Sequence, residues 1–88
     1  MAEKCNVVTG ATGLLGSHVA EALVARGERV RAVVRPGSDT AFLRGLGVEL
    51  APGDLHDPAS LRRAVAGADV VYHCAARTRG SVLRSRGP

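Results

Sequence analysis

The segment Thr9-Gly10-Ala11-Thr12-Gly13-Leu14-Leu15-Gly16 follows an apolar run and opens a stretch in which apolar residues recur at helical spacing. A strand, a glycine-rich turn and a helix in this order are typical of a site for the phosphates of a dinucleotide. Only a residue without a side chain lets the backbone turn sharply there and approach a pyrophosphate. The N–H groups at the start of the helix then face the anion. The segment therefore predicts a dinucleotide-phosphate site.

Strands and helices alternate along the chain. Hydrophobic periodicity predicts strands at residues 4–9, 29–34, 48–51 and 68–74, and helices at 14–26, 39–46 and from Asp57-Pro58 to Gly67. The strands are continuous apolar runs, which is typical of a parallel sheet covered on both faces. Right-handed crossovers favour the strand order 3-2-1-4. We therefore expect an α/β fold, a partial Rossmann-like doubly wound sheet of about four strands with three helices. Strands three and four would be its exposed edges.

The net charge of +4 comes from the end of the chain. Residues 1–76 hold Lys4 and seven arginines against eight acids, whereas residues 77–88 hold four arginines and no acid. We expect a domain at 1–76 and a basic disordered tail at 77–88. The tail leaves open a role as an interaction module. Because no aromatic residue lies among its arginines to stack on bases, we expect no specific nucleic-acid binding.

The remaining composition bounds the location and the metal chemistry. Cys5 and Cys74 lie in strand-like runs without a Cys-x-x-Cys pair, so we expect two buried thiols. The three histidines, His18, His56 and His73, share no metal-ligand spacing, and we expect no metal site. No apolar run approaches the ~20 residues of a membrane span. We therefore expect a cytoplasmic protein that does not contact membranes.

Four features together resemble one family. They are the G-x-x-G-x-x-G spacing of Gly10, Gly13 and Gly16, Arg35 at the end of the second strand, Gly53-Asp54-Leu55 after the third, and His73-Cys74-Ala75-Ala76 at the end of the fourth. Over residues 4–76 the chain resembles the extended short-chain dehydrogenase/reductase family, in particular its NAD-dependent epimerase/dehydratase and dihydroflavonol-reductase-like group. The resemblance implies that Asp54 accepts the adenine amino group and that Leu55 packs on the ring. It also places Ala75 and Ala76 beside the cofactor's ribose and pyrophosphate.

The cofactor contacts follow from the glycine turn and from Arg35. Gly10 would form the turn, Gly13 would admit the phosphate, and Gly16 would let the helix lie on the sheet. Thr12, Leu14 and Leu15 would present N–H groups to the pyrophosphate. Binders of NAD usually carry an acid after the second strand, but the nearest one here is Asp39, four residues beyond Arg35. A guanidinium grips a 2′-phosphate, so Arg35 favours NADP over NAD.

The resemblance also implies a catalytic Tyr-x-x-x-Lys pair, which these 88 residues lack. The only tyrosine is Tyr72, position 76 is alanine, and the only lysine is Lys4. We therefore assign no catalytic residue and interpret the chain as a catalytically incomplete, truncated piece of a reductase or epimerase. The whole protein would transfer hydride to or from a sugar nucleotide, a ketone or an alcohol; its exact substrate stays open. The alternative is a non-catalytic NADP-binding sensor of the atypical short-chain reductase type.

Overall fold

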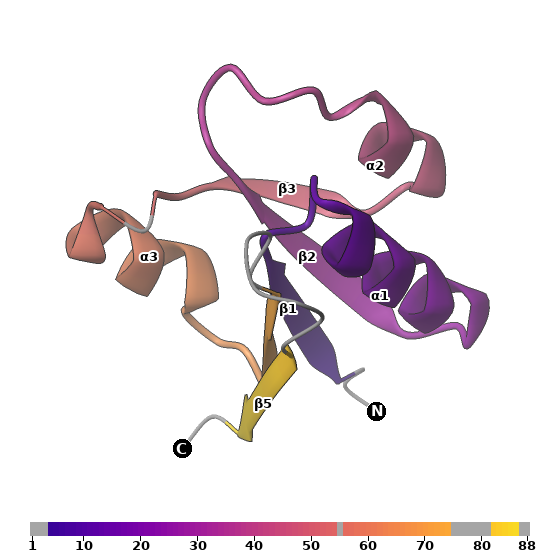
Figure 1. Cartoon of the computed structure of the whole chain (residues 1–88). Helices are drawn as coiled ribbons and strands as arrows, with labels where there is room; N and C mark the ends of the chain where they lie inside the picture. Colours follow the sequence, from indigo (N-terminus) through magenta and orange to yellow (C-terminus); the bar gives the residue numbers. More distant parts are fainter. Residues whose placement is uncertain (1–3, 55, 75–81, 87–88) are drawn as a thin grey trace.

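The chain folds as an open, twisted sheet with helices on both faces (Figure 1). The structure is a computed structural model, which describes residues 4–54, 56–74 and 82–86. Its elements follow in the order β1 (Cys5–Thr9), α1 (Leu14–Ala25), β2 (Arg29–Val34), α2 (Ala41–Leu46), β3 (Glu49–Pro52), α3 (Pro58–Val65), β4 (Val70–Cys74) and β5 (Val82–Arg86). The predicted elements are all present, and their ends differ from the predicted ones by two residues at most.

The sheet has the strand order β3-β2-β1-β4-β5. The first four strands are parallel, which confirms the predicted 3-2-1-4 arrangement with three helices. In the register of the central strands, Val8 pairs with Ala32 of β2 and with Tyr72 of β4. Because the strands are parallel, the carboxyl ends of β1, β2, β3 and β4 all lie at the same edge of the sheet. Of the predicted site residues that the structure describes, the glycine turn follows β1, Arg35 follows β2 and Asp54 follows β3 at this carboxyl edge.

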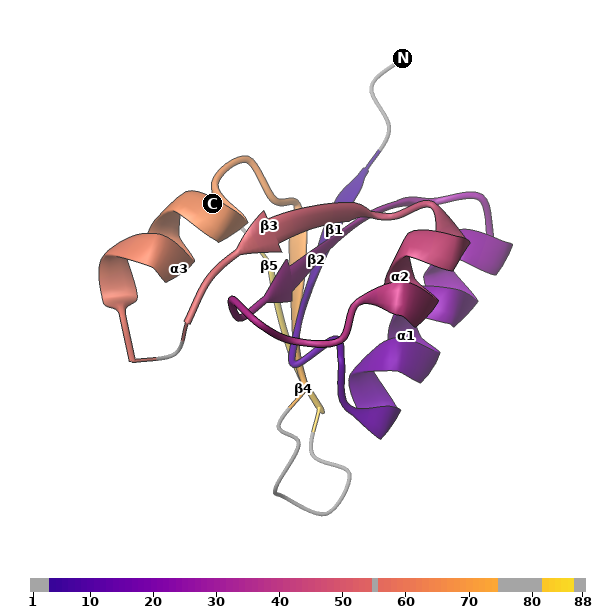
Figure 2. The same cartoon turned by 90° about the horizontal axis from the view of Figure 1, so that it is seen from above.

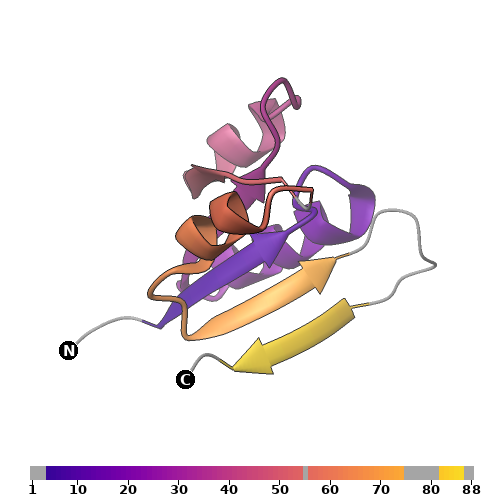
Figure 3. The same ribbon diagram turned by 90° about the vertical axis from the view of Figure 1, so that its left-hand side faces the viewer.

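Strand β5 corrects the prediction that the chain has no element beyond residue 77. Residues 82–86 pair antiparallel with β4, with His73 opposite Leu83, and Figure 3 shows the two arrows side by side in opposite directions. Strand β4 is therefore not an exposed edge. A strand whose N–H and C=O groups lack partners is a template for a further strand, and residues 82–86 supply one.

Helices α1 and α2 lie on one side of the sheet and α3 lies on the other (Figure 2), and each face has its own core. Successive residues of a strand point to opposite faces, so Val8 packs on the side of α1 and α2, and Val7 packs on the side of α3. Both valines are fully buried. The apolar strand residues therefore serve both layers, which is why their runs are continuous rather than alternating.

Helix α3 is held at both ends by polar contacts. Asp57 is its N-cap, whose Oδ1 accepts the N–H of Ser60 at 3.4 Å, and Pro58 occupies its first turn. At the other end, the Arg31 guanidinium donates to the carbonyls of Ala64 at 3.0 Å and Ala66 at 2.8 Å. These contacts fix α3 beside the end of β3 and so define one wall of the carboxyl edge.

Candidate functional site

The glycine turn rests on the end of β4. Gly10 follows β1 with φ of +66°, a left-handed conformation that glycine adopts without steric strain. A Cβ built on Gly10 would collide with the carbonyl oxygen of Cys74, and one on Gly16 would collide with the carbonyl oxygen of Gly10. The carbonyl of Gly10 also accepts the N–H of Gly13 at 3.1 Å. Gly10 and Gly16 are therefore required by the protein's own close packing.

Gly13 differs from these two glycines. It is the N-cap of α1 with φ of −78° and ψ of 171°, an extended conformation that any residue adopts. Backbone conformation therefore does not explain why this position is glycine. Its carbonyl accepts the N–H of Ser17 at 2.9 Å as the first hydrogen bond of α1. As a glycine, Gly13 places no side-chain atoms at the N-terminus of α1.

The first turn of α1 presents unpaired donors. Among the described residues, the N–H groups of Leu14, Leu15 and Gly16 have no hydrogen-bond acceptor, and Gly13 forms no side-chain cap. The turn also contains no acidic side chain. Leu14 is 79% exposed, so its own side chain does not cover these groups. Unpaired N–H groups at the positive end of a 12-residue helix form a favourable environment for an anion.

Arg35 stands at the same edge, directly after β2. Its side chain is exposed, and it forms no ion pair among the residues that the structure describes. Its carbonyl accepts the N–H of Ser38 at 3.1 Å, which closes the turn after the strand. Arg31 is different: it binds the end of α3, and its Nε lies 3.4 Å from Glu49 Oε1. Arg35 is thus available to a ligand, whereas Arg31 has a structural role.

Asp54 follows β3 and is partly buried. Its backbone N–H donates to Ser60 Oγ at 3.0 Å, and its Oδ1 accepts the N–H of His56 at 2.9 Å. One carboxylate oxygen therefore stabilises the local turn. The other oxygen has no hydrogen bond with a described residue. The predicted ligands Leu55, Ala75 and Ala76 lie outside the described residues.

A cavity of about 470 Å³ opens between the ends of β2, β3 and α3. Asp54 lines it, and so does Pro36, the neighbour of Arg35. Sequence reasoning missed two further lining residues, Ser60 and Arg63 of α3. The spacing of Asp57 and Ser60 is a helix-capping pattern and was detectable, but nothing in the sequence indicates that Arg63 faces a cavity. The ligand site of a doubly wound sheet lies at this carboxyl edge.

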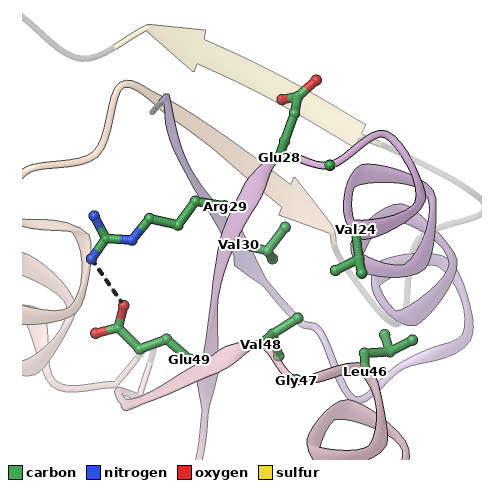
Figure 4. A pocket seen from close by; sticks show the side chains of 9 residues that line it. Val24, Glu28, Arg29, Val30, Leu46, Gly47, Val48 and Glu49 are labelled. Carbon is green, nitrogen blue, oxygen red and sulfur yellow. Dashed lines mark ion pairs between the residues drawn. The ribbon is translucent and has the colours of Figure 1, made fainter. Parts of the chain in front are cut away.

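A second cavity, of about 320 Å³, lies at the opposite, amino edge of the sheet (Figure 4). Its walls come from the ends of α1 and α2 and from the starts of β2 and β3. Its charged side chains are paired: Arg29 lies 3.6 Å from Glu49, and Glu28 lies 3.1 Å from Arg26. Glu28 also accepts the Nδ2 donor of the buried Asn6 at 2.9 Å. We attribute this cavity to the junction of two helix ends.

Three further observations concern thiols, metals and membranes. Both cysteines are buried and free, and burial raises the pKa of the Cys74 thiol above its ordinary value. Within the described ranges, no three His, Cys, Asp or Glu side chains gather to hold a metal ion. None of the helices in this part of the chain has the length and apolar character that a membrane crossing requires.

Comparisons with known proteins agree with this architecture. The model of the NmrA-like family matches residues 3–84. Sterol demethylase protein B of Methylococcus capsulatus is 56% identical over 70 residues, which are 80% of this chain and 21% of that protein. The chain thus spans about a fifth of that relative's length.

Solved structures give the same result. A nucleoside-diphosphate-sugar epimerase from Pseudomonas aeruginosa superposes with a TM-score of 0.77 at 39% identity, over 82% of this chain and 24% of that one. The structure of AtPrR2 with NADP+ and (+)-pinoresinol gives a TM-score of 0.75 at 29% identity, over 89% and 28% of the two chains. The resemblance to extended short-chain reductases and epimerases, stated from the motifs, is therefore confirmed.

Proposed function

Because the chain belongs to the NmrA-like family, we propose that it binds NAD(P) at the carboxyl edge and is the cofactor-binding part of a reductase or epimerase. The pyrophosphate would lie against the first turn of α1, at the N–H groups of Leu14, Leu15 and Gly16, with Thr12 and Gly13 beside it. Gly10 and Gly16 would hold this turn in place. The adenosine half would extend toward Arg35 and Asp54, at the ends of β2 and β3.

One observation carries the proposal. Gly13 has a backbone conformation open to every residue, yet it stands without a side chain in front of three N–H groups that lack acceptors among the described residues. A residue without a side chain and unpaired donors at a helix N-terminus together suit a bound diphosphate. AtPrR2, a structural neighbour, was solved with NADP+, which supports this class of ligand.

The preference for NADP over NAD rests on Arg35. This exposed guanidinium follows β2 and has no described ion-pair partner, and the nearest acid along the chain after it is Asp39. The Oδ1 of Asp39 accepts the N–H of Ala41 at 3.1 Å, so this carboxylate is engaged at the start of α2. An arginine without a competing acid suits a 2′-phosphate, whereas NAD binders place an acid on the ribose 2′-OH.

The chemistry of the whole protein is a further part of the proposal. Curated relatives include a ceramide reductase of Caulobacter vibrioides, and a structural neighbour is a sugar-nucleotide epimerase. We infer hydride transfer between the nicotinamide ring and a ketone, an alcohol or a sugar nucleotide. These 88 residues hold no Tyr-x-x-x-Lys pair, so the chain alone would bind the cofactor without turning over substrate.

A titration with NADPH, followed by its fluorescence, tests the proposal. The wild-type chain should bind, and Gly13→Asp should abolish binding because its carboxylate would stand where the phosphates lie. Asp is a favourable N-cap residue and φ at this position is ordinary, so the variant should keep its fold and its thermal midpoint.

Gly45→Asp is the matched control for this charge. A Cβ at Gly45 meets no atom within 4 Å, and the residue lies in α2, away from the glycine turn. This variant should bind NADPH as the wild type does. Equal binding by wild type and Gly13→Asp would refute the phosphate site.

Arg35→Asp tests the cofactor preference. The variant should lose about 1.5–3 kcal/mol of NADPH binding, roughly a 10- to 100-fold change, because the hydrogen bonds to a charged group are lost and replaced by repulsion. NADH binding should change little. An unchanged ratio of NADPH to NADH affinity would show that Arg35 does not read the 2′-phosphate.

A further inference from the structure

The cavity between β3 and α3 is lined by both apolar and polar residues. Pro36 and Pro52 belong to the first, and Asp54, Asp57, Ser60 and Arg63 belong to the second. In Figure 1, α3 lies beside the end of β3, and the loop that follows β2 rises above both. The volume of about 470 Å³ falls within the range of small-ligand sites. The cavity therefore has the size to hold a ring system.

Most polar groups of the cavity are already engaged within the protein. Ser60 Oγ donates to the Asp57 carbonyl at 2.8 Å and accepts the N–H of Asp54 at 3.0 Å. Asp57 Oδ1 caps α3, and Asp54 Oδ1 closes the turn at His56. Three groups remain: the second carboxylate oxygens of Asp54 and Asp57, and the Arg63 guanidinium, which forms no hydrogen bond or ion pair with the described residues.

The charge of the cavity determines which class of ligand these groups suit. Two carboxylates and one guanidinium line it, so its formal charge is negative and a phosphate would be repelled. A planar, uncharged heterocycle that bears an amino group fits better. The Asp54 carboxylate would accept a hydrogen bond from the amino group, and the planar Arg63 guanidinium would stack on the ring face.

We propose that Arg63 is a cofactor-contact residue, whose guanidinium covers the face of the adenine ring while Asp54 accepts its amino group. This inference rests on the proposed function and adds a residue from α3 to it. It also assigns different roles to Arg35 and Arg63. Arg35 reads the 2′-phosphate at the end of β2, and Arg63 holds the base that NADP and NAD share.

Arg63→Ala tests the inference, with Arg62→Ala as its matched control. Both arginines are exposed and lie in the last turn of α3, but Arg62 does not line the cavity. Removal of the stacking contact should weaken NADPH and NADH by the same factor, about 3- to 30-fold. Arg62→Ala should leave both affinities unchanged. Alanine is the strongest helix former, so equal thermal midpoints would establish that both variants are folded.

The possible outcomes separate the inference from the proposed function. A loss confined to NADPH would mean that Arg63 contacts the 2′-phosphate, and would overturn the stacking role. An equal loss in both variants would mean a general effect of surface charge and would also overturn it. If Arg63→Ala binds the cofactors as tightly as the wild type does, while Gly13→Asp still abolishes binding, only the inference fails. If the wild type binds neither cofactor, both fail.

A second measurement examines the base directly. The hypoxanthine analogue of NADH replaces the adenine amino group by a carbonyl, which an ionised carboxylate repels. It should bind the wild type more weakly than NADH does, and Asp54→Asn, whose amide can donate, should reduce that difference. Equal binding of both dinucleotides by the wild type would contradict the placement of the ring against Asp54.

Discussion

At the scale of single residues, the three glycines of the turn have different tasks. Gly10 and Gly16 are there because a Cβ would strike backbone atoms, whereas Gly13 has an extended backbone conformation that any residue adopts. A glycine motif in a sequence therefore combines positions that packing requires with one, Gly13, that we propose to serve binding. Only the backbone angles and neighbouring atoms separate the two kinds.

Gly10→Ala should be strongly destabilising. The left-handed conformation costs alanine about 1–2 kcal/mol, and the collision with the Cys74 carbonyl adds about 1–3 kcal/mol of overpacking. Gly27→Ala is the control, because Gly27 has φ of +78° but nothing within 4 Å of its Cβ. It should lose only the conformational part. Urea denaturation gives both free energies of unfolding, and equal losses would exclude the collision as a cause.

At the scale of elements, the sequence was most informative where local and long-range preferences agree. Apolar runs such as Val7-Val8 and Val33-Val34 predicted β1 and β2, and Asp57-Pro58 predicted the start of α3. Strand β5 was missed because Val82-Leu83 is too short an apolar pattern to predict a strand. Its formation depends on the otherwise free edge of β4, with which it pairs at five positions. The hydrogen bonds of this pairing stabilise β5.

The contacts of Arg31 and Asn6 were equally hidden from the sequence. Arg31 donates to carbonyls of α3 that lie 33 and 35 residues along the chain, and Asn6 binds Glu28, 22 residues away. Such pairs depend on the packing of elements, which no local pattern encodes. The same reason explains why Asp54 and the glycine turn were predicted for the site while Arg63 was not.

Asp57→Ala should weaken α3 and the wall that it provides. Loss of the N-cap acceptor should lower the free energy of unfolding by about 0.5–2 kcal/mol. Asp57→Asn retains an acceptor oxygen at the same position and should remain close to the wild type. Denaturant titrations of the three proteins separate capping from charge, since a loss of equal size in Asp57→Asn would point to the charge.

At the scale of the whole molecule, β5 covers one of the two outer strands of the parallel sheet, while β3 keeps a free edge in the described part of the chain. Strand β3 is only four residues long and ends at Pro52, which has no N–H to donate. A short edge that ends in proline is a poor template for association. Strand β4 is one residue longer and contains no proline, so its edge would be a better template for association if β5 did not cover it.

Removal of residues 77–88 should therefore expose β4 and promote self-association. We expect a concentration-dependent increase in mass by light scattering, and a Tm lower by about 4–8 °C for each 1 kcal/mol of stability lost. The double substitution Arg84→Gln and Arg86→Gln keeps the strand and removes its charge. Association of this control to the same extent would assign the effect to charge rather than to the open edge.

The close contact between Gly10 and the carbonyl of Cys74, the last residue of β4, links ligand affinity to global folding. The proposed phosphate site depends on the contact of Gly10 with Cys74 at the end of β4, so it would exist only while β1 and β4 are paired. A nucleotide bound there would stabilise the folded chain. At a concentration of a hundred times its dissociation constant it would raise the free energy of unfolding by about 2.7 kcal/mol. Substitutions remote from the pocket that loosen β4 would then show themselves as weaker binding, so a nucleotide titration would measure the integrity of the sheet.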